Sequence, residues 1–531
     1  MNRLAALVLL LIFTSASAVS TAADDPARNE RLRERLKSGV LRWGGDAEGG
    51  APYQLRDPQD PARVIGFEVE IADAVVATIG KQLKLPLKAQ FVQYEWVSLE
   101  QGLNDTKDFD LILSGYERNE DNKDRLRFSR PYCYYGLQLV VRANDNAIQT
   151  LADCVNRPVA TMAGTASERT VQQAGVKNIV TFAGQVEPFF DLELGRVDAV
   201  LLDLPVVTFY SAPNPRLKSV GPPIAPGAYL GALRRNDLDL AAAVDDALSA
   251  IMIDGTLRDI LRKWHLWDAD QARLAEGPKQ ADELRGLGFN AQGVAVDEST
   301  LPPVQTVDRN MIAASGEAWT FDRYAPVLLG GAAMTVLLTV LSMSLAMTLG
   351  LFVAICRLYA PKPVPMLALG YVEFFRGIPQ LLVLYFIYYG LPSIGIDVPA
   401  FYAAIIGFGL VYAAYESEIY RSAIESVPRG QWEAARALGM TETTAFHRVV
   451  FPQAFRTALG PMTNDFVAMF KDTSLVSVIA VSELTKEYLI LSRSSFKFVE
   501  LGILTAVLYL AMSVPLGYLS RYLEQRWGPK R

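Results

Sequence analysis

The 531-residue chain is too long for one compact domain, since about 150 residues per domain predicts three or four units. Hydrophobic residues form 51% of it, charged residues only 20%, and the mean hydropathy is +0.17, which argues against a fully soluble enzyme and places part of the chain in lipid. A net charge of −6 offers no basic face for nucleic acid, and three Cys and two His cannot supply the clustered ligands of a metal site.

The N-terminal segment 1–23 has the pattern of a secretory signal peptide. A positively charged start at Arg3 is followed by an apolar run over residues 4–13 and by small residues at 16–18. The apolar run is short for a bilayer core about 30 Å thick, although a permanent anchor helix remains the alternative. We therefore expect the part that follows to be exported.

Two soluble segments come next. Residues 24–267 alternate short apolar runs with amphipathic stretches, which predicts parallel sheets covered by helices. Cys133 and Cys154 can pair or stay free in an exported domain, and the sequence leaves this open. Residues 268–323 are rich in Ala, Gly and acidic residues without apolar periodicity, and we interpret them as a flexible linker.

The C-terminal part, residues 324–531, reads as an all-α membrane domain of five helices. The uncharged stretches that predict its spans are 327–356, 380–396, 398–415 and 501–520, with a weaker fifth, interrupted by charges, at 457–482. The positive-inside rule places the Arg-rich segment 421–456 and the C-terminus in the cytoplasm. Three cations do not fit this topology, because it places them outside: Lys486, Arg493 and Lys497.

A docking element is predicted inside the Arg-rich segment. Glu433, Ala434 and Ala435 are followed by Gly439, and Pro452 ends a Val-x-Phe-Pro motif. We expect the two alanines and Gly439 to share a helical face that another surface can approach closely, and Pro452 to stop the second helix. An ordinary amphipathic loop helix is the alternative.

The spacing of this block closely resembles the coupling loop of ABC importer permeases. The resemblance covers about residues 324–521 and narrows to the polar amino acid branch (His/Glu/Gln/Arg/opine type) through motifs that begin at Phe374, Ala414 and Lys471. It implies docking on a cytoplasmic ABC ATPase dimer and a second permease copy, most simply a homodimer. Ionisable groups at bilayer depth are costly and should face the bundle interior or its ends, to contact solute or to pair structurally. These groups are Glu373, Arg376, Glu416, Glu418, Lys471 and Asp472.

Residues 41–266 resemble the family 3 periplasmic solute-binding proteins. The resemblance rests on an ordered series of motifs, among them Arg-Trp-Gly-Gly-Asp at 42–46, Phe-Ser-Arg-Pro-Tyr at 128–132 and Gly-Arg-Val-Asp-Ala at 195–199. It implies a two-lobed type II α/β periplasmic binding protein fold. Crossing strands would join the lobes, which close on a small solute.

The same resemblance implies the solute-binding residues. Asp203 matches the family's ligand for the α-ammonium, although helix capping is an alternative role. Tyr53 and Trp96 match positions that hold the ligand side chain, with a core role as the alternative for Trp96. A helix N-terminus at Gly164 and Thr165 matches a carboxylate cradle. The predicted set is Asp46, Tyr53, Trp96, Ser114, Gly115, Glu117, Asn122, Gly164, Thr165 and Asp203.

Asn122 is the largest departure from this family. It falls where relatives carry the Arg that grips the α-carboxylate, and Glu117 falls on a Ser position. Candidate replacements, which require a shifted loop, are Arg118, Lys123 and Arg125. With Asp46, Glu117 and Asp203 projected toward the cleft, we expect a pocket that disfavours anions and accepts an amine or a cationic amino-acid-like solute.

The chain has no Gly-x-x-x-x-Gly-Lys-Ser/Thr loop, so we expect it to bind no cofactor and to depend on ATP hydrolysed by a separate ATPase. We interpret it as a non-enzymatic ABC importer subunit that combines receptor and permease for a polar amino acid or similar solute. We expect a multi-pass protein of the inner membrane bilayer, with a periplasmic N-terminal domain, a cytoplasmic C-terminus, and no nucleic-acid partner. The alternatives are a ligand-gated channel, for which we find no filter sequence, and a periplasmic enzyme on the same fold.

Overall fold

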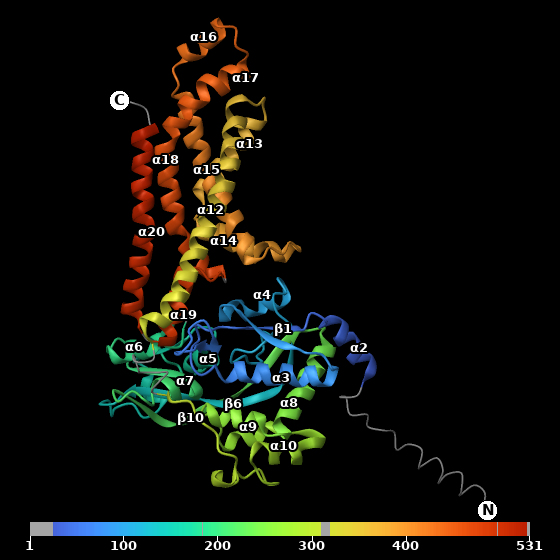
Figure 1. Cartoon of the computed structure of the whole chain (residues 1–531). Helices are drawn as coiled ribbons and strands as arrows, with labels where there is room; N and C mark the ends of the chain where they lie inside the picture. Colours follow the sequence, from blue (N-terminus) through green and yellow to red (C-terminus); the bar gives the residue numbers. More distant parts are fainter. Residues whose placement is uncertain (1–24, 183, 310–318, 480, 496, 528–531) are drawn as a thin grey trace, which may run out of the picture.

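The computed structural model describes residues 25–182, 184–309, 319–479, 481–495 and 497–527. They form an α/β part, residues 25–309, and a helical part, residues 319–527, that stands on it (Figure 1). The segment predicted as a signal peptide lies outside the described residues.

One mixed sheet runs through the α/β part. Its strands are β1 (Val40–Gly45), β4 (Lys88–Gln93), β5 (Leu111–Ile112), β6 (Leu126–Arg142), β7 (Pro158–Met162), β8 (Asn178–Phe182), β9 (Ala199–Asp203) and β10 (Leu217–Arg234), in the order β4-β1-β5-β10-β6-β9-β7-β8; β2 (Leu55–Arg56) and β3 (Val64–Ile65) form a separate pair. On one side of the sheet, β4, β1 and β5 are parallel to one another. On the other side, β9, β7 and β8 are parallel to one another. Between them, β6 and β10 are 17 and 18 residues long and antiparallel, so they connect two lobes, each built on a parallel group.

Helices cover both lobes. The first lobe has α2 (Pro26–Arg35), α3 (Phe67–Leu83), α4 (Leu99–Asn104), α8 (Leu238–Ile253) and α9 (Thr256–Lys263), with the 3-10 turn η2 (Trp96–Ser98); the second has α5 (Ala166–Gln173), α6 (Glu187–Glu193) and α7 (Leu204–Tyr210), with η3 (Leu151–Cys154). In α3, Ile71, Val75 and Ile79 are four residues apart and fully or almost fully buried, so one helix face packs into the core. Cys133 and Cys154 are buried and unpaired.

The segment predicted as a flexible linker is packed against the first lobe over much of its length. It contains η4 (Ala269–Leu274), η5 (Gly277–Lys279), α10 (Gln280–Leu287) and η6 (Glu298–Thr300). Leu274, Leu287 and Phe289 are buried in the core, and Glu283 pairs with Arg130 at 2.6 Å. Short 3-10 turns place these side chains at irregular spacings, so helical periodicity could not reveal them.

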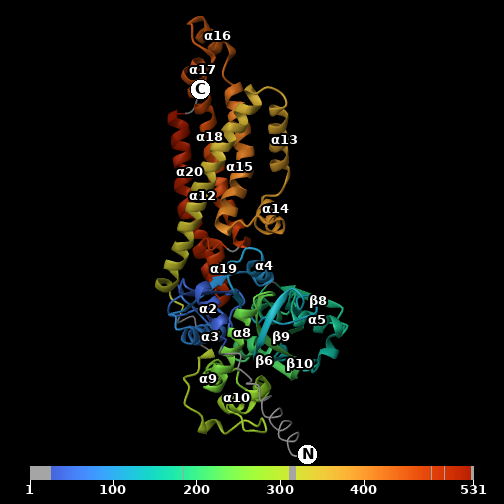
Figure 2. The same ribbon diagram turned by 90° about the vertical axis from the view of Figure 1, so that its right-hand side faces the viewer.

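The helical part contains α12 (Phe321–Tyr359), α13 (Val364–Gly377), α14 (Gln380–Tyr385), η7 (Phe386–Gly390), η8 (Leu391–Ile394), α15 (Ala400–Glu425), α16 (Arg429–Ala437), α17 (Glu442–Ala445), η9 (Phe446–Val450), α18 (Phe451–Asp472), η10 (Thr473–Ile479), α19 (Leu484–Ser495) and α20 (Phe498–Trp527). Four long helices, α12, α15, α18 and α20, lie side by side, and α13 lies on the outer side of α15 (Figure 1, Figure 2). The short helices α16 and α17 are at the end opposite the α/β part.

The predicted count of five spanning helices is not confirmed. Among the described residues, three helices are long and apolar enough to cross a membrane: Phe321–Tyr359, Ala400–Glu425 and Phe498–Leu523. A fourth candidate is the pair Val364–Gly377 and Gln380–Gly390, bent by 106°. The predicted span 380–396 is therefore not one straight helix. The 22-residue α18 contains Asp465 and Lys471, which lower its hydropathy although it packs between α15 and α20.

Candidate functional site

Asp203 is the centre of a buried polar cluster between the lobes. Its Oδ2 accepts hydrogen bonds from the hydroxyls of Tyr229 at 2.6 Å and Tyr53 at 3.2 Å, and its Oδ1 accepts one from Ser167 at 3.3 Å. Burial raises the pKa of Asp203, while these hydroxyls oppose the rise. Asp203 also occupies the N-cap position of α7, but its side chain makes no capping bond and accepts the three hydroxyls instead. The predicted residues Tyr53 and Asp203 thus meet.

Asp46 does not face the cleft as expected. Its carboxylate accepts the backbone N–H groups of Glu48 and Trp96 and the Nε2–H of Gln93, each at 2.9 Å. Its own N–H donates to Ser114 Oγ at 3.2 Å, and Trp96 Nε1 donates to the Ser114 carbonyl at 3.1 Å. These bonds tie Asp46 to neighbouring backbone and side-chain groups of the first lobe, so Asp46 and Ser114 position the Trp96 loop.

The predicted carboxylate cradle at Gly164 and Thr165 is occupied by the side chain of Glu168 from the same helix. Glu168 Oε2 accepts the Gly164 N–H at 2.7 Å, and Thr165 Oγ1 caps the Glu168 N–H. The Gly115 N–H is also bonded within the protein, because it donates to Glu68 at 2.7 Å. Burial raises the pKa of Glu68 to about 7.

Asn122 organises its own loop. Its Oδ1 accepts the Asn119 N–H and its Nδ2 donates to the Glu117 carbonyl, both at 2.8 Å, and the residue is only 3% exposed. The Glu117 side chain instead reaches Arg169 of the second lobe, with Nη2 and Oε2 3.2 Å apart. Burial and the nearby charge of Asp203 raise the pKa of Glu117 to about 8, although Arg169 opposes the rise.

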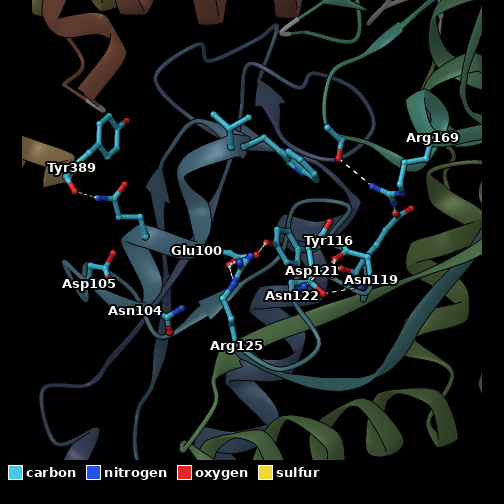
Figure 3. A pocket seen from close by; sticks show the side chains of 15 residues that line it. Glu100, Asn104, Asp105, Tyr116, Asn119, Asp121, Asn122, Arg125, Arg169 and Tyr389 are labelled. Atoms are coloured by element: carbon cyan, nitrogen blue, oxygen red, sulfur yellow. Dashed lines mark hydrogen bonds and ion pairs between the residues drawn. The ribbon is translucent and has the colours of Figure 1, made fainter. Parts of the chain in front are cut away.

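A cavity of about 640 Å³ opens beside this pair (Figure 3). Four of the predicted residues line it: Trp96, Glu117, Asn122 and Gly164. Arg169 also lines it, and Tyr389 of the helical part closes one side. Of the proposed replacement cations, Arg125 lines the cavity but pairs with Glu100 at 2.9 Å, Lys123 pairs with Glu120, and Arg118 is exposed.

Motif reasoning did not identify Arg169, Tyr229 and Ser167. Ser167 and Arg169 follow the Gly164–Thr165 turn within the first turn of α5, so extending the motif by one helical turn could have found them. Tyr229 lies on the crossing strand β10, and only the pairing of strands brings it to Asp203.

The cations that did not fit the predicted topology contact the α/β part. Lys486, 1% exposed, forms ion pairs with Glu48 and, at 3.3 Å, with Glu95. Arg493 pairs with Glu48 of the first lobe and, at 2.8 Å, with Glu187 at the start of α6 in the second. Because both cations lie on α19, this helix holds the two lobes at once.

Two further contacts reinforce this junction. Arg56 on β2 pairs with Glu487 on α19 at 2.6 Å. Tyr389 of η7 forms hydrogen bonds with Ser98 at 3.0 Å and with Gln101 at 3.1 Å. Lys497, the third cation, stays within the helical part, where it donates to the Trp319 carbonyl at 2.9 Å.

The predicted docking loop lies at the far end of the helices. Glu433, Ala434 and Gly439 are exposed, whereas Ala435 is 2% exposed and packs inward, so the two alanines do not share a face. Pro452 lies in the first turn of α18 and begins this helix rather than stopping one. Leu438, which sequence reasoning missed, is 78% exposed.

Of the six ionisable residues predicted at bilayer depth, three are buried or bonded to other side chains and three are exposed. Glu416 is fully buried, Glu418 pairs with Arg357 and Arg421, and Asp472 accepts the Tyr412 hydroxyl. Lys471 is exposed in the last turn of α18. Glu373 and Arg376 are exposed on α13, contrary to expectation, because that helix lies outside the bundle core.

Comparisons with known proteins match both parts. Residues 41–266 match the bacterial extracellular solute-binding proteins, family 3, and residues 346–529 match the binding-protein-dependent transport system inner membrane component family. The probable amino-acid ABC transporter permease protein YckA of Bacillus subtilis is 37% identical over 203 residues, 38% of this chain and 90% of YckA. The L-cystine transport system permease protein TcyB of the same species is 38% identical over 202 residues, 38% of this chain and 86% of TcyB.

Among solved structures, an ancestral arginine-binding protein bound to arginine aligns with a TM-score of 0.39 and 28% identity over 43% of this chain and 98% of its own. The N-terminal domain has the type II α/β binding-protein fold, and the helical part is a membrane permease. The chain belongs to the amino-acid ABC transporter permeases and carries a solute-binding domain in the same polypeptide as a non-enzymatic transport subunit.

Proposed function

We propose that this chain imports a polar amino acid and that the cleft around Asp203 is its receptor site. The observation that carries the proposal is the cluster of acceptor and donor groups between the lobes. Asp203 and Glu117 offer carboxyl groups to the solute's ammonium; the Tyr53 hydroxyl contacts Asp203, and Trp96 lines the cavity with Glu117. Hydroxyl donors satisfy Asp203 without neutralising its charge, so it stays available to a cation.

The arrangement of the two parts supports a periplasmic receptor and a cytoplasmic coupling loop. The solute-binding domain and the loop α16–α17 lie at opposite ends of the long helices (Figure 1). The side chains of Phe352, Val499 and Ile503 are exposed along those helices, as expected of surfaces that face lipid. The receptor cavity reaches Tyr389, so a released solute would leave the lobes directly beside the permease.

The partners of this importer would bind at the ends and sides of the permease. The exposed Leu438 and Glu433 present an apolar and a charged contact to a cytoplasmic ATPase dimer, which supplies and hydrolyses ATP. A second copy of the chain would provide the other half of the pathway. The complex would then carry two receptors.

Reconstitution tests this function. The full chain is placed in liposomes with or without a co-expressed ABC ATPase of the amino-acid importer class, and uptake of labelled polar amino acids is followed. We expect uptake that requires both the ATPase and ATP. Rapid flux through the chain alone would overturn the proposal and support a ligand-gated channel. Chemical conversion of the amino acid would support an enzyme.

A further inference from the structure

The pocket lacks a guanidinium at the position predicted by sequence register. Asn122 is buried, and both ends of its amide are bonded to its own loop. An amide at position 122 would bind a solute carboxylate more weakly than the bidentate ion pair that an arginine there could form. Arg125 faces the cavity from the first lobe, but its guanidinium is paired with Glu100.

Arg169 offers a guanidinium to the same cavity from the opposite lobe (Figure 3). It contacts Glu117 through one nitrogen at 3.2 Å and the Gly164 carbonyl through the other at 3.4 Å. Its side chain is 40% exposed. An arginine has five N–H donors in a planar fork, so single long contacts leave donors that can turn toward a carboxylate.

We propose that Arg169 binds the α-carboxylate of the solute, and that it makes the pocket select zwitterionic α-amino acids over the corresponding amines. The proposal rests on the proposed function and names its substrate class. In this structure Arg169 is paired with Glu117. A solute would exchange this single ion pair for two, because its ammonium would bind Glu117 and Asp203 while its carboxylate would bind Arg169.

The electrostatics of the cleft favour this exchange. The pKa of Glu117 is raised to about 8 even with Arg169 beside it, so one long contact does not compensate for its burial. An ammonium at hydrogen-bond distance would stabilise the ionised Glu117 more strongly. Glu117 of the first lobe and Arg169 of the second already contact each other. A bound amino acid would keep this link between the lobes, through its own ammonium and carboxylate.

The test measures binding to the full chain in lipid nanodiscs by calorimetry and by intrinsic tryptophan fluorescence, to which the cavity-lining Trp96 contributes. The probes are L-arginine with agmatine and L-glutamine with 4-aminobutanamide, each pair differing only in the carboxylate. The variants are Arg169→Gln, Arg169→Lys and the control Arg125→Gln, which removes a second arginine from the same cavity. A melting temperature for each variant verifies folding.

We expect the native chain to prefer one amino acid over its amine by at least tenfold. Arg169→Gln should lower the affinity for that amino acid by about ten- to a hundredfold, since a charge-assisted bond contributes roughly 1.5–3 kcal/mol. Its affinity for the amine should change less than threefold. Arg169→Lys should lie between, and Arg125→Gln should retain the preference. If a folded Arg169→Gln keeps the same ratio of amino-acid affinity to amine affinity, the role of Arg169 is wrong, while the proposed function still stands. A native chain that binds neither amino acid, nor any other of the twenty, overturns the proposed function with it.

Discussion

Asp203 is buried, yet three hydroxyl groups surround it rather than a cation. Hydroxyls from Tyr53, Tyr229 and Ser167 donate to its two oxygens, which lowers the free-energy cost of burying a carboxylate. A permanent Arg or Lys partner would lower that cost further but would compete with a solute's ammonium. The three hydroxyls therefore hold the Asp203 carboxyl group in place without a permanent cation, and a solute's ammonium could supply that charge.

Glu117 gives a prediction about pH. Because burial and the charge of Asp203 raise its pKa to about 8, most of Glu117 is protonated at pH 7, and an ammonium that binds beside it must displace the proton. We expect affinity for L-glutamine or L-arginine to rise between pH 6 and pH 8, by up to about tenfold per unit, and to level off above. Calorimetry in buffers of different ionisation enthalpy should detect nearly one released proton at pH 6.

The variant Glu117→Gln provides the control, since it has no proton to release. Its affinity should be lower at pH 8 and should not change with pH. Binding to the native chain that is independent of pH, with no proton released, would mean that the ammonium does not lie beside Glu117.

At the scale of elements, the end of α16 determines the shape of the coupling loop. Gly439 has a φ of +76° and donates its N–H to the Arg436 carbonyl at 2.9 Å, a left-handed ending that glycine adopts easily. A Cβ at this position would meet no atom within 4 Å. Within this chain a large residue at position 439 would therefore meet backbone strain and no steric clash.

We predict that Gly439→Arg leaves solute binding unchanged but lowers solute-stimulated ATP hydrolysis at least tenfold in the reconstituted complex. Asparagine tolerates the left-handed conformation, so Gly439→Asn should retain most of the stimulation. Equal stimulation by Gly439→Arg and the native chain would show that this turn does not contact the ATPase.

At the scale of the whole molecule, α19 connects the receptor to the permease. Arg493 contacts a carboxylate from each lobe, Glu48 and Glu187, so its full set of ion pairs requires the lobes to be in the relative position seen here. Opening the cleft would move Glu187 relative to Glu48 and remove one pair. The junction can therefore report cleft closure to the membrane helices.

Substitution of Arg493 tests this connection. Arg493→Gln should reduce transport and ATPase stimulation at least fivefold while changing the dissociation constant of the solute less than threefold, since removing one member of a buried pair is costly for the docked state. Lys497→Gln is the matched control, because Lys497 pairs with Glu500 of the next helix instead of the receptor. If Arg493→Gln shows normal transport and ATPase stimulation, the junction only holds the receptor domain to the permease and does not transmit cleft closure.

The sequence by itself determined the order of the two parts, because contiguous motifs and hydropathy carry this information. It did not determine the Arg169–Glu117 pair, the packed residues of the segment 268–323 or the bend that left five spans unconfirmed. The clearest case is the junction, where Arg493 and Glu48 are 445 residues apart. Such pairs depend on how helices and lobes pack, since a charge that conflicts with a local pattern is stabilised only by a partner that the tertiary structure brings to it.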